Sequence, residues 1–265
     1  MIYSLLYGGI VMNWWEEYFS KYYYNTAFSV RGKAKQEIEF ILSKTNVPKN
    51  SNVLDMCCGY GRHSIELALK GLNTTGIDYS SDLIRMANDE LLSMNINNLT
   101  FKRGDIRKYI SPKNYDLVIC LYMSFGYFSD LENEIAFHNL SESLNVGGYL
   151  VIELYNPDQV KNANFEENKR MLGGKSLYIH RRYNKKSKRT EIERVITNRD
   201  GKKEKFDMSI RVYSVDELTE IALINKLNFV GVYGDYFGNE LSENSEKMIV
   251  IYRKEEVNEE YRKFQ

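Results

Sequence analysis

The residues best suited to hold a small ligand lie in the segment 53–63, which reads VLDMCCGYGRH. A short apolar run carries the acid Asp55, and a turn with Gly59 and Gly61 leads into an expected helix. Glycine permits backbone angles that are closed to other residues, and it lacks the Cβ atom that would block a ligand. In open α/β sheets, ligands bind at the carboxyl ends of the strands. The segment therefore predicts a small molecule lying directly against this turn.

Two acids further along the chain indicate which ligand the turn holds. Asp78 ends the next apolar stretch, where its carboxylate can accept both hydroxyls of a ribose. Asp105 follows a third such stretch, where it can accept a hydrogen bond from the amino group of an adenine. A glycine turn, a ribose acid and an adenine acid, at the ends of three successive strand–helix units, resemble the class I S-adenosylmethionine-dependent methyltransferases. The resemblance extends from about residue 31 to about residue 254.

The resemblance implies S-adenosylmethionine as cofactor and gives roles to several residues of this chain. In related enzymes a basic residue before the first strand often holds the cofactor carboxylate, and Arg31 occupies that position. A guanidinium suits this contact because it can bind a carboxylate through two hydrogen bonds. Cys57 stands where the family usually has glycine, and we interpret this small residue as a tolerated replacement. The predicted cofactor contacts are Tyr22, Arg31, Asp55, Cys57, Gly59, Gly61, Asp78, Tyr79, Asp105, Ile106 and Leu121.

A nicotinamide dehydrogenase is the nearest competing interpretation. Its fingerprint, G-x-G-x-x-G, needs a third glycine so that the helix can pack closely. Here Ser64 stands three positions beyond Gly61, so the fingerprint is incomplete. The methyltransferase interpretation also explains both downstream acids, which an ordinary strand-to-helix turn would leave unexplained.

The hydrophobic pattern predicts five strand–helix units followed by an antiparallel insertion. Strands are expected at 52–56, 73–78, 99–104, 115–121 and 149–154, and a helix at 130–145. From Gly174 the pattern alternates, which predicts three insertion strands at 177–183, 191–197 and 206–212. The last two strands, 229–233 and 247–252, are close enough to pair as a hairpin.

We therefore expect an α/β fold with a Rossmann-like methyltransferase sheet. Its seven strands are mostly parallel with an antiparallel final strand, and a three-stranded antiparallel insertion is added to it. The expected domains are a helical lid segment at 1–50, a cofactor-binding domain at 51–156 and 214–254, a substrate roof at 157–213 and a charged tail at 255–265. In the lid, Tyr18, Tyr22 and Tyr23 are the expected contacts to bound cofactor.

Methyl transfer needs few catalytic groups, because the cofactor supplies most of the driving force and the protein aligns donor and acceptor. No catalytic residue can be assigned from the sequence. Tyr122 and Tyr127, after the fourth strand, are candidates, with aromatic packing as an equal alternative. Arg211 is a third candidate, which strand alternation leaves exposed unless it holds an acidic acceptor, and Asp235 could complete the site. His63 is expected to support the site rather than act as a base.

Composition excludes several classes of protein. The 265 residues include 36 basic and 36 acidic side chains, so no global charge favours nucleic acid or an anionic membrane. Three cysteines, two of them adjacent, indicate a reducing compartment rather than a disulfide framework. No segment is apolar enough for a membrane helix, and residues 1–12 lack the features of a signal peptide. We expect a cytoplasmic protein without a metal site, as a monomer or homodimer.

The leading functional hypothesis is methylation of a nitrogen or oxygen of a small molecule. The insertion resembles that of enzymes acting on glycine or amino sugars, and SFGYF, RVY and GDYFG resemble segments of a broad bacterial and archaeal group of such enzymes. The alternatives are an RNA or protein methyltransferase and a cofactor-binding protein without catalysis. The RNA or protein methyltransferase alternative rests on a cluster of basic residues. Acidic residues follow this cluster directly in the sequence, so we do not expect nucleic acid as the partner. The cluster comprises Arg181, Arg182, Lys185, Lys186, Lys188 and Arg189.

Overall fold

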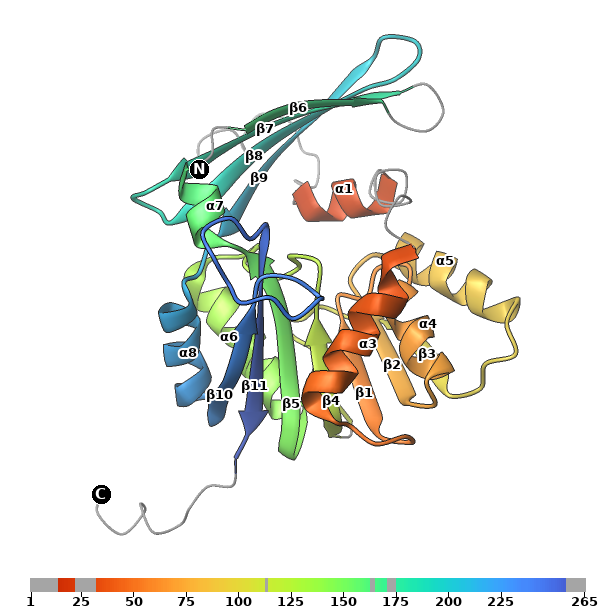
Figure 1. Ribbon diagram of the computed structural model, residues 1–265. Helices are drawn as coiled ribbons and strands as arrows, with labels where there is room; N and C mark the ends of the chain where they lie inside the picture. The colour runs from red at the N-terminus through yellow and green to blue at the C-terminus, as the bar shows by residue number, and fades with distance from the viewer. Residues whose placement is uncertain (1–13, 22–31, 113, 163–164, 171–174, 256–265) are drawn as a thin grey trace.

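The computed structural model describes residues 14–21, 32–112, 114–162, 165–170 and 175–255. Within these residues one sheet of seven strands forms the centre of the molecule (Figure 1). In spatial order its strands are β10 (Leu227–Tyr233), β11 (Lys247–Lys254), β5 (Leu144–Tyr155), β4 (Tyr115–Cys120), β1 (Asn52–Met56), β2 (Asn73–Asp78) and β3 (Leu99–Arg103).

The strand directions are those of the expected methyltransferase sheet. β3, β2, β1, β4 and β5 pair in parallel, whereas β11 runs antiparallel to both of its neighbours, β5 and β10. The predicted hairpin of the last two strands is thereby confirmed. Parallel strands need a crossover segment between them, so their carboxyl ends meet at one edge of the sheet. Asp55, Asp78 and the loops after β3 and β4 all lie at that edge.

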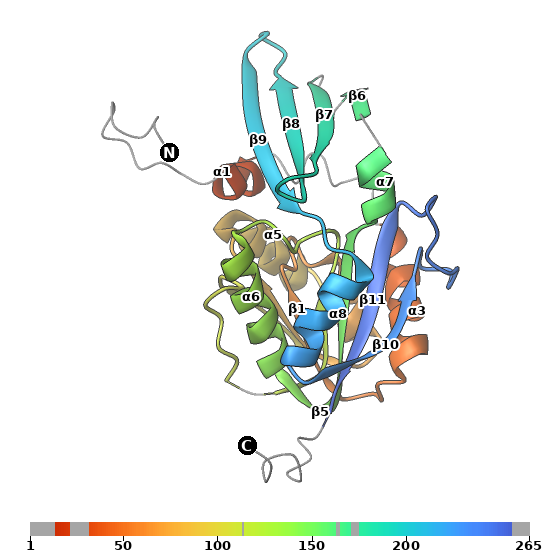
Figure 2. The same ribbon diagram turned by 90° about the vertical axis from the view of Figure 1, so that its left-hand side faces the viewer.

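Helices cover both faces of this sheet (Figures 1 and 2). They are α3 (Ala34–Thr45), α4 (Arg62–Leu69), α5 (Ser81–Leu92), α6 (Asp130–Glu142) and α8 (Val215–Ile224). Neighbouring residues of β1, Val53 and Leu54, belong to different hydrophobic clusters, and both are 0% exposed. Val53 packs with Ile38 of α3, while Leu54 belongs to the core that contains Leu218 of α8. The central strands are therefore buried on both faces, as their continuous apolar runs require.

Helix α6 ends earlier than its sequence pattern predicts. We expected helix over 130–145, but α6 ends at Glu142 and β5 begins at Leu144, which pairs with Tyr115. Pairing with β4 supplies hydrogen bonds that compete with a last helical turn. The start of α6 at Asp130 matches the predicted start. Helix α5 begins after Ser80, whose hydroxyl accepts a hydrogen bond from the Leu83 backbone N–H.

The insertion forms a second, antiparallel sheet beyond the carboxyl edge of the first (Figure 1). The three predicted strands are present, and a fourth, β6, is added to them at the outer edge in the described part of the chain. Its strands are β6 (Phe165–Arg170), β7 (Ser176–Asn184), β8 (Arg189–Thr197) and β9 (Lys203–Arg211), and α7 (Pro157–Asn162) connects it to β5.

The aromatic N-terminal segment forms a short helix, α1 (Trp14–Lys21), between the second sheet and α5 (Figure 1). Tyr18 is 1% exposed and packs against Phe206 of β9 in an edge-to-face contact. Tyr22, Tyr23 and Arg31 lie outside the described residues. No helix within the described ranges is long and apolar enough to cross a membrane.

Candidate functional site

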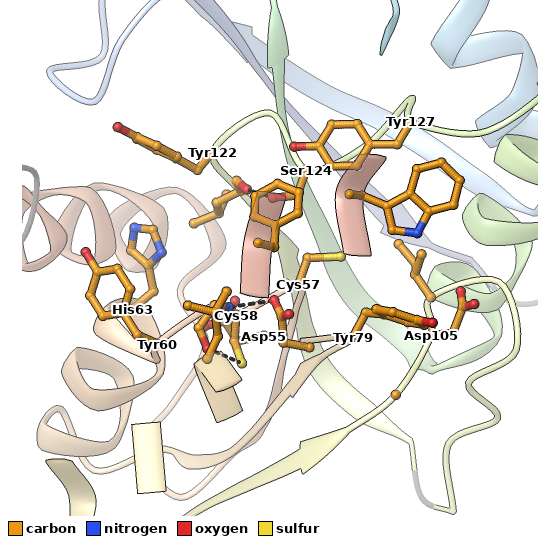
Figure 3. Close-up of a pocket in the computed structure, with 18 of the residues that line it drawn as sticks. Asp55, Cys57, Cys58, Tyr60, His63, Tyr79, Asp105, Tyr122, Ser124 and Tyr127 are labelled. Atoms are coloured by element: carbon orange, nitrogen blue, oxygen red, sulfur yellow. Dashed lines mark hydrogen bonds between the residues drawn. The ribbon is translucent and has the colours of Figure 1, made fainter. Parts of the chain in front are cut away.

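A pocket of about 850 Å3, including space open to solvent, lies at the carboxyl edge of β1, β2 and β4. Most of the predicted site residues that the structure describes line it. They are Asp55, Cys57, Gly59, Asp78, Tyr79, Asp105, Ile106, Leu121, Tyr122 and Tyr127. Figure 3 shows Tyr79 and Asp105 on one side, Tyr60 and His63 on the other, and Tyr122 and Tyr127 above them.

The turn after β1 owes its shape to three left-handed residues. Cys57, Gly59 and Gly61 have φ values of 62°, 58° and 85°. Cys57 therefore holds a conformation in which glycine is the low-cost residue, which explains why glycine is usual there. Gly61 does not line the pocket, contrary to its predicted role. A Cβ atom there would lie 2.4 Å from the Phe101 ring, so this glycine permits close packing of α4 on β3.

Asp78 is held by the turn that it faces. Its two carboxylate oxygens accept hydrogen bonds from the backbone N–H groups of Gly59 at 2.8 Å and Ser80 at 2.9 Å. Burial outweighs these bonds and raises the pKa of Asp78 to about 6. The carboxylate is thus partly desolvated before any ligand arrives, which makes hydroxyl donors from a ligand favourable partners.

Asp105 has a different electrostatic environment. Burial alone would raise its pKa, but hydrogen bonds from Arg107, at 2.7 and 3.1 Å, lower it. The Arg107 guanidinium carbon also lies 4.3 Å from the centre of the Phe128 ring. Sequence reasoning missed Arg107, although its position two residues after the predicted adenine acid was a usable signal. Asp105 therefore stays ionised and fixed in orientation at the pocket wall.

The opposite wall carries a buried charge cluster that the sequence only partly indicated. One carboxylate oxygen of Glu37 accepts a hydrogen bond from Arg62 at 2.5 Å, and the same oxygen lies 2.7 Å from Nε2 of His63. Burial opposes ionisation of Glu37, but His63 and Arg62 together lower its pKa to about 2. His63 thus contacts Glu37 at this wall of the pocket. Arg62 lines the pocket and lies 4.9 Å from the Tyr122 ring centre, so it supplies a basic group at this wall.

The loop after β4 is fixed from the neighbouring strand β5. The Tyr122 backbone has φ 62°, and its N–H donates to Glu153 at 3.1 Å. The same oxygen of Glu153 accepts from the Tyr236 hydroxyl at 2.5 Å, and its other oxygen lies 2.8 Å from Nζ of Lys247. Burial raises the pKa of Tyr122, so its phenol is protonated at neutral pH. This network of buried groups holds the Tyr122 loop where the pocket needs it.

A second pocket adjoins the first beneath the antiparallel sheet. It measures about 1450 Å3, including open space, and receives Ile179, Arg194 and Met208 from that sheet. Phe19, Tyr122 and Tyr127 line both pockets. The two pockets therefore meet at these three rings, with the β1–β2–β4 strand ends on one side and the insertion on the other.

Helix α1 contacts both pockets. Glu16 accepts a hydrogen bond of 2.5 Å from the hydroxyl of Tyr79 in the first pocket, and Tyr18 accepts one from Arg194 in the second. The ring of Trp14 lies 5.1 Å from that of Tyr127 at the junction. This position is the one that a lid would need.

Arg211 lies away from both pockets, which corrects its proposed role in holding an acceptor. Strand β9 ends at this residue, and the chain turns there toward α8. The guanidinium is buried against Glu217, at 2.8 Å, with Asp130 at 3.8 Å. The alternation argument assumed a strand that continues through Val212, so it could not anticipate this ion pair. Asp235 likewise lines neither pocket and instead accepts hydrogen bonds within its own turn, from Phe237 and Asn239.

Comparisons with known proteins agree with this geometry. A family model described as a methyltransferase domain matches residues 53–148. A probable S-adenosyl-L-methionine-dependent methyltransferase, TehB of Haemophilus influenzae, is 29% identical over 146 residues, covering 55% of this chain and 47% of the relative. A dTDP-3-amino-3,4,6-trideoxy-alpha-D-glucopyranose N,N-dimethyltransferase of Streptomyces venezuelae is 27% identical over 113 residues, covering 42% and 46%. The chain thus spans about half the length of the curated relatives that it matches.

Among solved structures, an S-adenosylmethionine-dependent methyltransferase from Clostridium acetobutylicum superposes with a TM-score of 0.76 at 18% identity. The superposition covers 88% of this chain and 99% of that one, so the shared fold includes the main sheet and at least part of the insertion. Residues 53–148 thus match a methyltransferase domain, and the fold of the described chain is that of solved S-adenosylmethionine-dependent methyltransferases.

Proposed function

We propose that this protein transfers the methyl group of S-adenosylmethionine to a nitrogen or oxygen of a small molecule bound in the second pocket. The observation that carries the proposal is the junction of the two pockets at Phe19, Tyr122 and Tyr127. When bound, the cofactor supplies an activated methyl group on a sulfonium. Direct displacement needs donor and acceptor to be aligned in adjoining sites, and two joined pockets provide that arrangement.

The residues of the first pocket suit the chemistry of this cofactor. Asp78 would accept hydrogen bonds from the ribose hydroxyls, and Asp105 would accept one from the adenine amino group. Arg62 is a buried cation on the opposite wall, suited to the carboxylate of the methionine portion, and Arg31 keeps its sequence-based role as a second proposal. Cys57 and Gly59 provide the close backbone approach, with Asp55, Tyr79, Ile106 and Leu121 completing the wall.

The protein's contribution to catalysis would be alignment and exclusion of water. Tyr122, whose phenol stays protonated, is suited to donate a hydrogen bond at the junction. Tyr127 stacks on Phe19, with ring centres 6.0 Å apart, and thereby narrows the passage between the pockets. We propose these two tyrosines as the residues that orient the acceptor.

A macromolecular acceptor is less compatible with the charges of the insertion. Much of the basic cluster is engaged in ion pairs: Arg182 with Glu191, Lys188 with Glu217 and Arg189 with Asp130. These pairs favour a small-molecule acceptor over RNA. The three cysteines carry free thiols, which supports the proposed cytoplasmic location. A monomer or homodimer, and the division into lid, cofactor domain, roof and tail, remain part of the same proposal.

The test is a screen of metabolite pools, and separately of RNA, for acceptor-dependent formation of S-adenosylhomocysteine. A small-molecule fraction should support turnover by the wild type, and the Asp78→Ala variant should lose it. A Tyr127→Phe variant should turn over more slowly while binding S-adenosylhomocysteine normally. Turnover with RNA but with no metabolite fraction would contradict the proposal, and failure to bind S-adenosylhomocysteine would contradict its cofactor half.

A further inference from the structure

The inner face of the second sheet is apolar except for a few charged side chains. In the strand register Arg194 pairs with Ile179 and Phe206, and Arg181 pairs with Ile192. These positions share one face, because cross-strand partners point to the same side of a sheet. Ile192 and Phe206 are buried in the cluster that packs on α1. Arg181 and Arg194 therefore place two guanidinium groups on the apolar roof of the second pocket, which both residues line.

Arg194 differs from Arg182 and Arg189 of the same sheet in its partners. Arg182 and Arg189 each pair with a carboxylate. Arg194 instead donates to the Tyr18 hydroxyl and lies 4.9 Å from the centre of the Tyr18 ring. Its Nε atom is buried without a hydrogen-bond partner, and no carboxylate of the described residues forms an ion pair with it. A guanidinium that is partly buried and has a buried N–H without a partner is costly, so an anion entering this pocket would be stabilised by it.

We propose that the methyl acceptor carries a carboxylate and that Arg194 binds it, an inference that rests on the function proposed above. The carboxylate would supply the missing counter-charge and an acceptor for the guanidinium. A single negative charge fits better than a phosphate dianion, because Glu167 and Glu246 also line this pocket. Arg181, whose guanidinium lies 4.8 Å from the Tyr155 ring centre, adds positive potential on the same wall.

The position of Arg194 would also determine which part of the acceptor reacts. Arg194 is on the roof, whereas the two pockets meet at Tyr122 and Tyr127. An acceptor anchored by its carboxylate at the roof would extend its nitrogen or oxygen nucleophile toward those rings. Arg194 would thus determine substrate specificity. The expected acceptor is a small molecule with a carboxylate at one end and a nucleophilic nitrogen or oxygen at the other.

The two tryptophans of the chain allow each pocket to be observed separately. Trp14 lines the second pocket and Trp15 the first. In a Trp15→Phe protein, Trp14 fluorescence reports on the second pocket. Titrations with benzoate, benzamide and phenyl phosphate, in the presence of S-adenosylhomocysteine, then compare an anion, its neutral isostere and a dianion. We expect saturable binding of benzoate. Benzamide, which lacks the charged hydrogen bond, should bind roughly tenfold more weakly or worse. Phenyl phosphate should also bind roughly tenfold more weakly or worse, because its second negative charge meets Glu167 and Glu246.

Two arginine variants in the Trp15→Phe background separate binding from folding. Arg194→Met should abolish the preference for benzoate over benzamide, and Arg194→Lys should retain part of it. Arg182→Met, on the outer face of the same sheet, should keep the full preference. Thermal unfolding of each variant checks that the fold is intact. The comparison of benzoate with benzamide is made first in the Trp15→Phe protein, which keeps Arg194. That comparison remains valid even if a variant at position 194 fails to fold.

Three results would overturn the inference: no saturable response to benzoate, equal binding of benzoate and benzamide, or an unchanged preference in Arg194→Met. Tighter binding of phenyl phosphate than of benzoate would overturn the choice of a carboxylate. A Trp14→Phe protein, in which Trp15 reports on the first pocket, tests the proposed function independently. If Trp15 fluorescence in this protein responds to S-adenosylhomocysteine, the cofactor site is functional, and a missing response to benzoate then contradicts only the carboxylate site.

Discussion

The pH dependence of cofactor binding is the sharpest test of the role proposed for Asp78. Burial raises the pKa of this carboxyl from 3.8 to about 6 in the free protein. Only the ionised form can accept hydrogen bonds from two ribose hydroxyls with both oxygens, so bound cofactor favours ionisation and lowers this pKa again. Affinity should therefore be full above neutral pH and fall as the pH drops through 6.

The magnitude follows from the ionised fraction. If only the carboxylate form binds, roughly one-tenth of the protein is competent one pH unit below the pKa, so affinity falls about tenfold, or about 1.4 kcal/mol. The free protein behaves in the opposite sense. Because the folded pKa is raised, ionised Asp78 costs roughly 3 kcal/mol of stability at neutral pH, by 1.36 kcal/mol per pKa unit. That cost disappears as the pH falls through 6 toward 3.8.

Titration calorimetry with S-adenosylhomocysteine between acid and neutral pH measures this effect. Asp78→Ala should bind more weakly by roughly 2–3 kcal/mol at neutral pH and lose the break near pH 6. Asp105→Asn should retain the break, because Arg107 lowers the pKa of Asp105 and takes it out of this range. His63→Gln is a control for the nearby imidazole and should also retain it. Constant affinity across this range in the wild type would refute the reasoning.

Other predictions concern the turn, the β5 network and the lid. Cys57→Gly should be more stable than Cys57→Ala by roughly 1 kcal/mol in urea unfolding, because both lose the thiol but only alanine keeps a Cβ at φ 62°; equal stability would argue against strain at this turn. Glu153→Ala should lower the free energy of unfolding by roughly 3 kcal/mol, since it leaves the cation of Lys247 without its partner at 2.8 Å; a loss below about 1 kcal/mol would show that the pair is solvated. Backbone hydrogen exchange in α1 should slow when S-adenosylhomocysteine binds while α8 stays unchanged, and identical exchange in α1 would leave it as plain packing.

The sequence alone was sufficient to predict the main sheet and the acids at its strand ends, for a local physical reason. The turn containing Gly59, the strand-end acids Asp78 and Asp105, and the apolar runs between them are each set by neighbouring residues. Parallel strands then bring those ends to one edge without further information. Local pattern failed where tertiary pairing competes with it, as at the end of α6, where β5 pairs with β4 from Leu144 onward.

The second pocket was decided by tertiary structure. Alternation correctly indicated the apolar face of Phe206, Met208 and Ile210, but it could not show what that face covers. Arg194 had no distinguishing motif, because its isolation from carboxylates depends on which side chains of α1 and β5 lie opposite. The same alternation predicted that Arg211 would be exposed, yet it pairs with Glu217 of α8 once the chain leaves the sheet. Spacing along a chain reports which face a residue occupies, whereas the partner across that face, and therefore the chemistry of the acceptor, is set only when distant segments pack.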